Sequence, residues 1–113
     1  MQKMSLDAIA REQLELAKSN AASRSSCTVF GGHEHAMRQT VVALAGDASL
    51  GEHENPGEAT LCVLRGRVRL SAGADTWEGR TGDLLIVPDA RHTLDALEDA
   101  VVLLTAVPRS HIR

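Results

Sequence analysis

The chain has 113 residues, a length that fits one domain with a single hydrophobic core. Its formal net charge is −3 and only 2% of its residues are aromatic, so it lacks the positive surface and the stacking side chains that nucleic acids require. No apolar run reaches transmembrane length, and Cys27 and Cys62 form no CxxC pair. We therefore predict a reduced, cytoplasmic protein that binds neither nucleic acid nor a membrane.

Residues 5–18 are predicted to form an amphipathic helix. Ser5 can cap its start, and Asp7 suits the positive end of the helix dipole. The apolar residues that follow helical spacing are Leu6, Ile9, Ala10, Leu14 and Ala17. The small polar residues 19–26 are predicted to be a linker. We accordingly divide the chain into a helix with its linker, residues 1–22, and a β-barrel domain, residues 23–113.

From residue 27 onward the apolar pattern changes to short alternating runs separated by turn residues such as Gly, Pro and Asp. Strands are predicted at residues 27–30, 37–45, 49–54, 60–64, 67–70, 76–78, 84–87, 92–97 and 101–107. Turns are predicted between them, including one at Pro56-Gly57. Many short strands at close spacing are typical of an all-β sandwich or barrel.

Two segments carry the strongest signal. Residues 51–70 contain His53, a Pro-Gly turn and two strands around a tight turn, and residues 82–92 contain Pro88 and His92. On these residues the chain resembles the small single-domain cupins, the conserved-barrel (RmlC-like jelly-roll) type. The resemblance implies an all-β fold: a cupin-type double-stranded β-helix (jelly-roll barrel) with one N-terminal α-helix.

The resemblance also implies a place for a metal, because metal-binding cupins hold one divalent ion with three His and one Glu. The match to that ligand set is partial. His53 stands at the first His, but Asn55 replaces the second His and Ala59 stands at the Glu position. In the second motif His92 comes one residue early, and Ala96 falls where the motif has Asn.

His53 and His92 are the two metal-ligand candidates that keep their motif positions. In the segment GGHEHAMRQT, His33 and His35 would share one face if the segment is extended, so they are candidates for the missing ligands. If three imidazoles converge, a divalent transition metal (Fe, Mn, Ni or Zn) can bind. The alternative is that these histidines line a pocket or a strand entrance and bind nothing.

Four further residues are candidates for binding a small molecule. Arg38 lies next to the histidine segment and could fix an anionic ligand, or it could be a surface charge. Asn55 can offer a carbonyl oxygen to a ligand. Leu61 and Val63 share one face of a strand and are predicted to line the wall beside His53 and His92.

Three functions remain open, because a barrel of this kind hosts many activities. The first is a small cupin that binds a small molecule, with or without a divalent metal, and has no assigned reaction. The second is a metal-dependent enzyme, an isomerase or dioxygenase of a small polar or anionic substrate. The third is a structural dimer with a vestigial pocket. A homodimer is predicted in each case, because a small barrel has strand edges to protect.

Overall fold

The computed structural model describes residues 1–55 and 57–111. In this part of the chain one α-helix precedes nine strands and a short 3-10 helix. Their bounds are α1 Leu6–Ser19, β1 Arg24–Phe30, β2 Arg38–Leu44, β3 Ser49–His53, β4 Gly57–Arg65, β5 Arg67–Ala72, β6 Asp75–Arg80, β7 Leu84–Ile86, β8 His92–Ala96, β9 Ala100–Pro108 and η1 Arg109–His111. Each predicted strand is present. Of the predicted Pro56-Gly57 turn, Pro56 lies outside the described residues.

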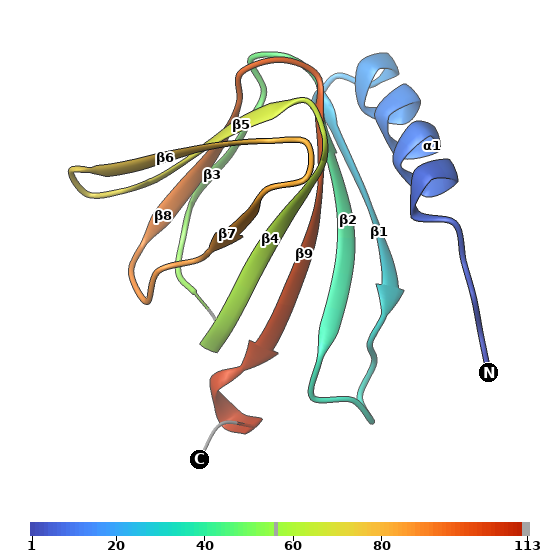
Figure 1. Cartoon of the computed structure of the whole chain (residues 1–113), viewed down its shortest axis with the longest axis vertical. Coiled ribbons are helices and arrows are strands. Elements are labelled where there is room, and N and C mark those ends of the chain that lie inside the picture. The colour runs from blue at the N-terminus through green and yellow to red at the C-terminus, as the bar shows by residue number, and fades with distance from the viewer. Residues whose placement is uncertain (56, 112–113) are drawn as a thin grey trace.

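The strands form two antiparallel sheets that face each other (Figure 1). The first has five strands in the order β1-β2-β9-β4-β7, and the second has four in the order β3-β8-β5-β6. Neighbours in each sheet are mostly distant in sequence, because the chain repeatedly crosses from one sheet to the other. The expected all-β fold with one N-terminal helix is therefore confirmed.

The core lies between the two sheets. Alternate residues of β2, β4 and β9 face alternate residues of β5 and β8, which is the pattern that a period of two produces. The fully buried side chains of this interior cluster include Leu44, Val63, Val68, Leu70, Leu94 and Val102. Its members are almost all aliphatic, as the scarcity of aromatic residues requires.

The helix α1 packs on the outer face of the five-stranded sheet, next to β1 and β2 (Figure 1). Ser5 caps it, because the Ser5 hydroxyl accepts a hydrogen bond from the Ala8 N–H at 3.1 Å. Ala10 and Ala17 are buried against the sheet, where their small side chains let the helix approach closely. The helix begins and ends one residue later than predicted, and none of the described helices is long and apolar enough to cross a membrane.

The predicted linker at residues 19–26 is too long. Strand β1 already begins at Arg24, which lies opposite Leu44 on β2. Along β1, every second residue is half-buried against the helix side, and the Ser25 hydroxyl bonds to the side chain of Gln13. The serines of this edge strand hide the alternation of inward and outward residues in the sequence, because their burial is partial and their side chains are polar.

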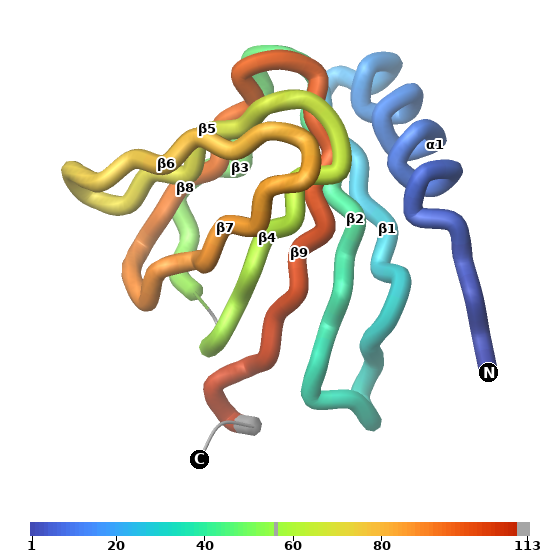
Figure 2. Tube along the Cα trace, in the orientation of Figure 1, coloured from blue at the N-terminus to red at the C-terminus, as the bar shows by residue number. Residues whose placement is uncertain are grey.

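The two segments that carry His53 and His92 meet at one end of the molecule. The trace in Figure 2 shows that the chain leaving β3 and the loop between β7 and β8 run side by side there.

Tight packing at the opposite turn, between β4 and β5, requires Gly66. Its φ is +76°, and a Cβ on it would lie 2.0 Å from the Asp99 carbonyl oxygen.

Candidate functional site

Two histidines meet at the end of the barrel interior. His53 at the end of β3 lies opposite His92 at the start of β8, past an irregularity in the strand pairing. Their ring centroids are 4.3 Å apart and their planes are inclined at 67°. Leu50 and Leu94, the neighbouring pair on the same two strands, pack in the interior core. The side chain of His92 is two residues from Leu94 and therefore shares its inward face.

The backbone sets the tautomer of both rings. The Nδ1 atom of His53 lies 2.7 Å from the Gly51 carbonyl oxygen, and the Nδ1 atom of His92 lies 2.9 Å from the Ala90 carbonyl oxygen. A carbonyl oxygen only accepts hydrogen bonds, so each Nδ1 carries the proton and donates it. In the neutral rings each Nε2 therefore keeps its lone pair, ready to accept a hydrogen bond or to bind a cation.

His92 is only 6% exposed. No contact to a described residue satisfies its Nε2 atom, and no fully buried side-chain nitrogen or oxygen in residues 1–55 and 57–111 lacks a partner. His53 is exposed. The pair thus presents two nitrogen acceptors at an accessible position.

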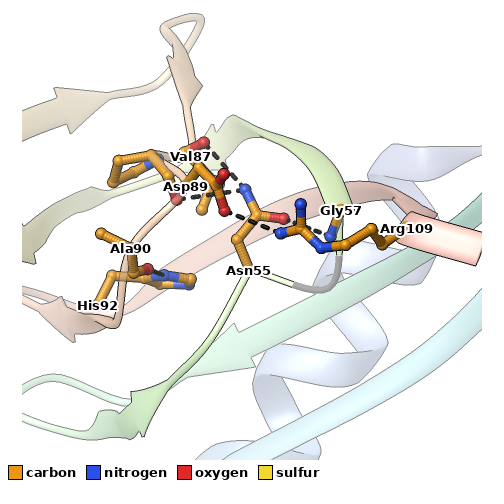
Figure 3. A network of polar contacts seen from close by, with 8 residues as sticks. Asn55, Gly57, Val87, Asp89, Ala90, His92 and Arg109 are labelled. Carbon is orange, nitrogen blue, oxygen red and sulfur yellow. Dashed lines mark hydrogen bonds and ion pairs between the residues drawn. The ribbon is translucent and has the colours of Figure 1, made fainter. Parts of the chain in front are cut away.

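Asn55 holds the two histidine-bearing segments together (Figure 3). Its side chain is 7% exposed, and its Nδ2 donates to the carbonyl oxygens of Val87 and Pro88, at 3.2 Å each. Its Oδ1 accepts a hydrogen bond from the Gly57 N–H at 2.9 Å. The amide that was expected to contact a ligand is therefore engaged with the backbone, and it connects the chain after β3 to the end of β7.

Exposed ion pairs lie around this connection. Arg91, beside His92, pairs with Glu52 at 2.6 Å and with Glu54 at 3.5 Å, and these glutamates flank His53. The hydrogen bond that Arg91 donates to the Glu52 carboxylate raises the pKa of Arg91 above its usual range. Arg109 pairs with Asp89 at 2.9 Å (Figure 3). Each exposed pair contributes little to stability, but the two pairs of Arg91 add a second set of contacts between the histidine-bearing segments.

The wall at the motif's carboxylate position is apolar. Ala59 is buried in the interior core, and its carbonyl oxygen accepts a hydrogen bond from the Val87 N–H at 3.0 Å. Leu61 and Val63, the predicted wall residues, are also buried there on the same face of β4. These side chains form an aliphatic part of the core where the motif has a carboxylate.

His33, His35 and Arg38 lie at the hairpin between β1 and β2. The segment is not extended as supposed: His33 lies in a turn that the His35 N–H closes by donating to the Gly32 carbonyl oxygen at 3.2 Å. Both histidines are exposed, and the His35 ring lies 4.6 Å from the ring of Phe30. Arg38 begins β2 and is exposed. Within residues 1–55 and 57–111, no three His, Cys, Asp or Glu residues form a group that could hold a metal ion.

Solved structures match the chain over most of its length. A cupin superfamily protein from Desulfitobacterium hafniense aligns over 96% of this chain and 94% of its own, with a TM-score of 0.74 and 16% identity. A conserved protein of unknown function from Streptococcus pyogenes aligns over 79% and 77%, with a TM-score of 0.70 and 24% identity. An RmlC-like cupin from Shewanella frigidimarina aligns over 78% of each chain, with a TM-score of 0.69 and 13% identity. The chain has the cupin fold.

Identities of 24% or less establish the fold of this chain and not its activity. No family model matches the sequence. No curated protein matches it either.

Sequence reasoning missed the connecting role of Asn55. A signal was present, because an Asn that precedes Pro-Gly often accepts a hydrogen bond from the backbone two residues on. The bonds from Asn55 to Val87 and Pro88 span more than thirty residues of sequence, and no local pattern indicates them.

Proposed function

We propose that this cupin binds a small molecule at the His53–His92 pair and that binding, with no assigned reaction, is its function. The observation that carries the proposal is the fixed tautomer of two adjacent rings, which leaves both Nε2 atoms as acceptors at the mouth of the barrel. A fitting ligand offers a hydroxyl or amine hydrogen to these nitrogens. Its carbon skeleton would contact the aliphatic wall that includes Ala59 and Val87.

A resident metal fits the described residues poorly. Two imidazoles are present, but Ala59 has no ligand atom and the Asn55 amide is engaged by Val87, Pro88 and Gly57. Two protein ligands hold a transition metal weakly, since sites with resident metals use three or four.

The free Nε2 atoms nevertheless favour one second candidate: a divalent ion (Fe, Mn, Ni or Zn) bound together with a small molecule that supplies the remaining ligands. The ion would act as a Lewis acid on that molecule. This arrangement is the one in which an isomerase or dioxygenase activity on a small polar or anionic substrate would be chemically reasonable.

The test uses histidine ring signals in NMR spectra of untagged protein, because they report on the proposed atoms directly. Small alcohols, amines and carboxylates are titrated first without metal and then with Zn²⁺. We expect a binder to shift the His53 and His92 ring signals together while those of His33 and His35 stay unchanged. His35→Ala is the matched control variant, and His53→Ala should remove the response.

The two candidates give different results in this experiment. Shifts without metal support the binding module. Shifts that need Zn²⁺ and the small molecule together support the metal-dependent alternative. Protein that carries a full equivalent of tightly held metal after purification would contradict the proposal of a two-histidine binding site.

A further inference from the structure

Two arginines stand side by side on the outer face of the four-stranded sheet. Arg67 on β5 lies opposite Arg80 on β6, and directly opposed residues of an antiparallel pair point to the same side of their sheet. That side is the outer one, because the adjacent residues Val68 and Gly79 are buried while both arginines are exposed. The Cβ atoms of such a pair are about 5 Å apart, so the two positive charges share one patch of surface.

No carboxylate neutralises this pair within residues 1–55 and 57–111, where neither arginine forms an ion pair. The next pair along the same two strands, Arg69 and Glu78, has opposite charges and forms an ion pair at 3.6 Å. Carboxylates are not scarce, because the chain has 15 acidic residues and 12 Lys and Arg residues. Like charges directly opposite each other destabilise a sheet, and a negatively charged ligand between them would reverse that effect.

The two arginines line a hollow at the end of the molecule away from the histidine pair. The Thr81 N–H donates to the Gly66 carbonyl oxygen at 3.2 Å, and the Leu97 N–H donates to the Arg67 carbonyl oxygen at 2.9 Å. These bonds bring the β4–β5, β6–β7 and β8–β9 turns together (Figure 1). The hollow has a volume of about 410 Å³, a size that suits a small molecule. Its lining residues are Gly66, Arg67, Arg80, Thr81 and Glu98.

Most carboxylates near the hollow are engaged elsewhere. Asp83 accepts a hydrogen bond from the Arg80 backbone N–H at 2.9 Å, and Asp99 pairs with Lys18 at 3.5 Å. Glu98 lines the hollow and forms no ion pair in the described part of the chain. The lining side chains thus carry two positive charges and one negative charge.

We propose that this hollow binds the phosphate group of a small phosphomonoester. A guanidinium group is a planar fork that donates two parallel N–H bonds to one oxyanion. One fork already engages both oxygens of a carboxylate, whereas a phosphate group has three acceptor oxygens and can meet the forks of Arg67 and Arg80 together. The Thr81 hydroxyl is a further donor in the hollow.

Glu98 selects the form in which the phosphate arrives. An ionised carboxylate only accepts hydrogen bonds, so Glu98 repels free phosphate but can accept a hydrogen from a hydroxyl group on the organic part of the ligand. A phosphate ester of a small hydroxylated molecule therefore fits the lining groups better than inorganic phosphate does.

The test is a titration of isotope-labelled full-length protein, followed by NMR at constant ionic strength, with inorganic phosphate and with glycerol phosphate as the probes. The expected result is a saturable shift of the amide signals of the residues that line the hollow, while the His53 and His92 ring signals stay unchanged. Glycerol phosphate should bind about threefold more tightly than inorganic phosphate, as one added hydrogen bond to Glu98 predicts. Glu98→Gln should strengthen the binding of inorganic phosphate, because it removes the repulsion.

Arg67→Gln should weaken the binding of both probes at least about tenfold, because it removes one charged fork. Arg24→Gln is the matched control and should leave binding unchanged. Arg24 is also exposed and forms no ion pair in the described part of the chain, but it lies opposite Leu44 and not opposite a second arginine. The substituted side chains are exposed, so each variant should retain the far-UV circular dichroism and melting temperature of the wild type.

Shifts that spread over the whole surface and do not saturate would overturn the proposal, since they would show only general screening of charge. Equal losses of binding in Arg67→Gln and Arg24→Gln would overturn it as well. Equal affinities of the wild type for the two probes would overturn the assignment of a phosphomonoester.

Discussion

At the scale of single residues, the site depends more on backbone contacts than on charged side chains. The two rings are oriented by the carbonyl oxygens of Gly51 and Ala90, and the segments that carry them are joined by the Asn55 amide. Asn55 occupies the position at which a metal-binding cupin has a histidine. Asn55, a residue that could have bound a ligand, therefore fixes the positions of the two segments that carry His53 and His92.

Replacement of Asn55 by Ala should destabilise the protein. The change leaves the Gly57 N–H and the Val87 and Pro88 carbonyl oxygens without their partner, which costs about 1–3 kcal/mol in the free energy of unfolding. Urea denaturation measures the difference. Asn20→Ala is the matched control, because Asn20 bonds to the Arg24 carbonyl oxygen at an exposed position and should cost less. Equal losses in the two variants would contradict the connecting role.

The substitution Asn55→Asp tests the same contacts through pH. The ionised carboxylate that it introduces would face the two carbonyl oxygens that now accept hydrogen bonds from Asn55, and the repulsion should raise the pKa of this carboxyl in the folded variant. The unfolding free energy of the variant should therefore approach that of the wild type as pH falls through the folded pKa toward the lower pKa of the unfolded chain, where the carboxyl takes up its proton in both states. Denaturation curves at several pH values measure this trend, and a pH-independent difference would contradict it.

At the scale of elements, α1 is fitted to the sheet by small residues. Ala10 and Ala17 lie against a cluster that includes Val41, Ala43 and Val101, and larger side chains would hold the helix away from the strands. The N-terminal turn is also attached to the barrel by the Asp7–Arg65 ion pair at 2.8 Å.

The substitution Ala17→Leu should lower the free energy of unfolding by about 1–3 kcal/mol, since Ala17 has no room for added carbon atoms. Glu15→Leu, on the exposed side of the same helix, is the control and should have a small effect. Thermal melting followed by circular dichroism measures both. An Ala17→Leu variant as stable as the wild type would show that the helix can move from the sheet at no cost.

The ion pair of Asp7 predicts a pH dependence. The hydrogen bond from Arg65, with the charge of that side chain, lowers the pKa of Asp7 below its usual value of 3.8. Its contribution to stability is therefore present above 3.8 and is lost as pH falls through the lower folded pKa. Asp7→Asn should be less stable than the wild type at pH 7, and the difference should shrink in strong acid. Melting temperatures of both proteins across this range measure it, with Glu12→Gln as the control.

At the scale of the whole molecule, the five-stranded sheet is the layer between the helix and the four-stranded sheet. The interior cluster lies on one face of this sheet and the helix-side cluster on the other, with neighbouring residues of β2 and β9 pointing alternately into each. Loss of one cluster therefore disturbs the strands that hold the other.

We expect the helix and the barrel to unfold in one transition. Circular dichroism at 222 nm reports mainly on α1, and fluorescence reports on Trp77 of β6, the only tryptophan. The two urea curves should coincide, as in two-state unfolding of a single domain. A helix signal lost at lower urea than the fluorescence signal would contradict this and would support the separate N-terminal unit of residues 1–22 expected from the sequence.

The sequence predicts most of the strands because inward and outward residues alternate in them. It misplaces the start of β1, where serines at the sheet edge mask the alternation, and it leaves the His33–His35 segment undecided. A His-x-His spacing looks the same in a strand and in a turn, so the spacing alone does not decide between them. The proximity of His53 and His92 depends on the pairing of β3 with β8, which only the resemblance to cupins indicated.

The carbonyl oxygens that fix the two ring tautomers belong to positions 51 and 90, and any amino acid with the same backbone path supplies the same oxygen. At Gly51 an added Cβ would meet no atom within 4 Å. The side chains at positions 51 and 90 can therefore change while Nδ1 remains the protonated nitrogen of both imidazoles. For a protein engineer, a substitution at position 51 is a way to change ligand preference without changing the tautomer of either histidine.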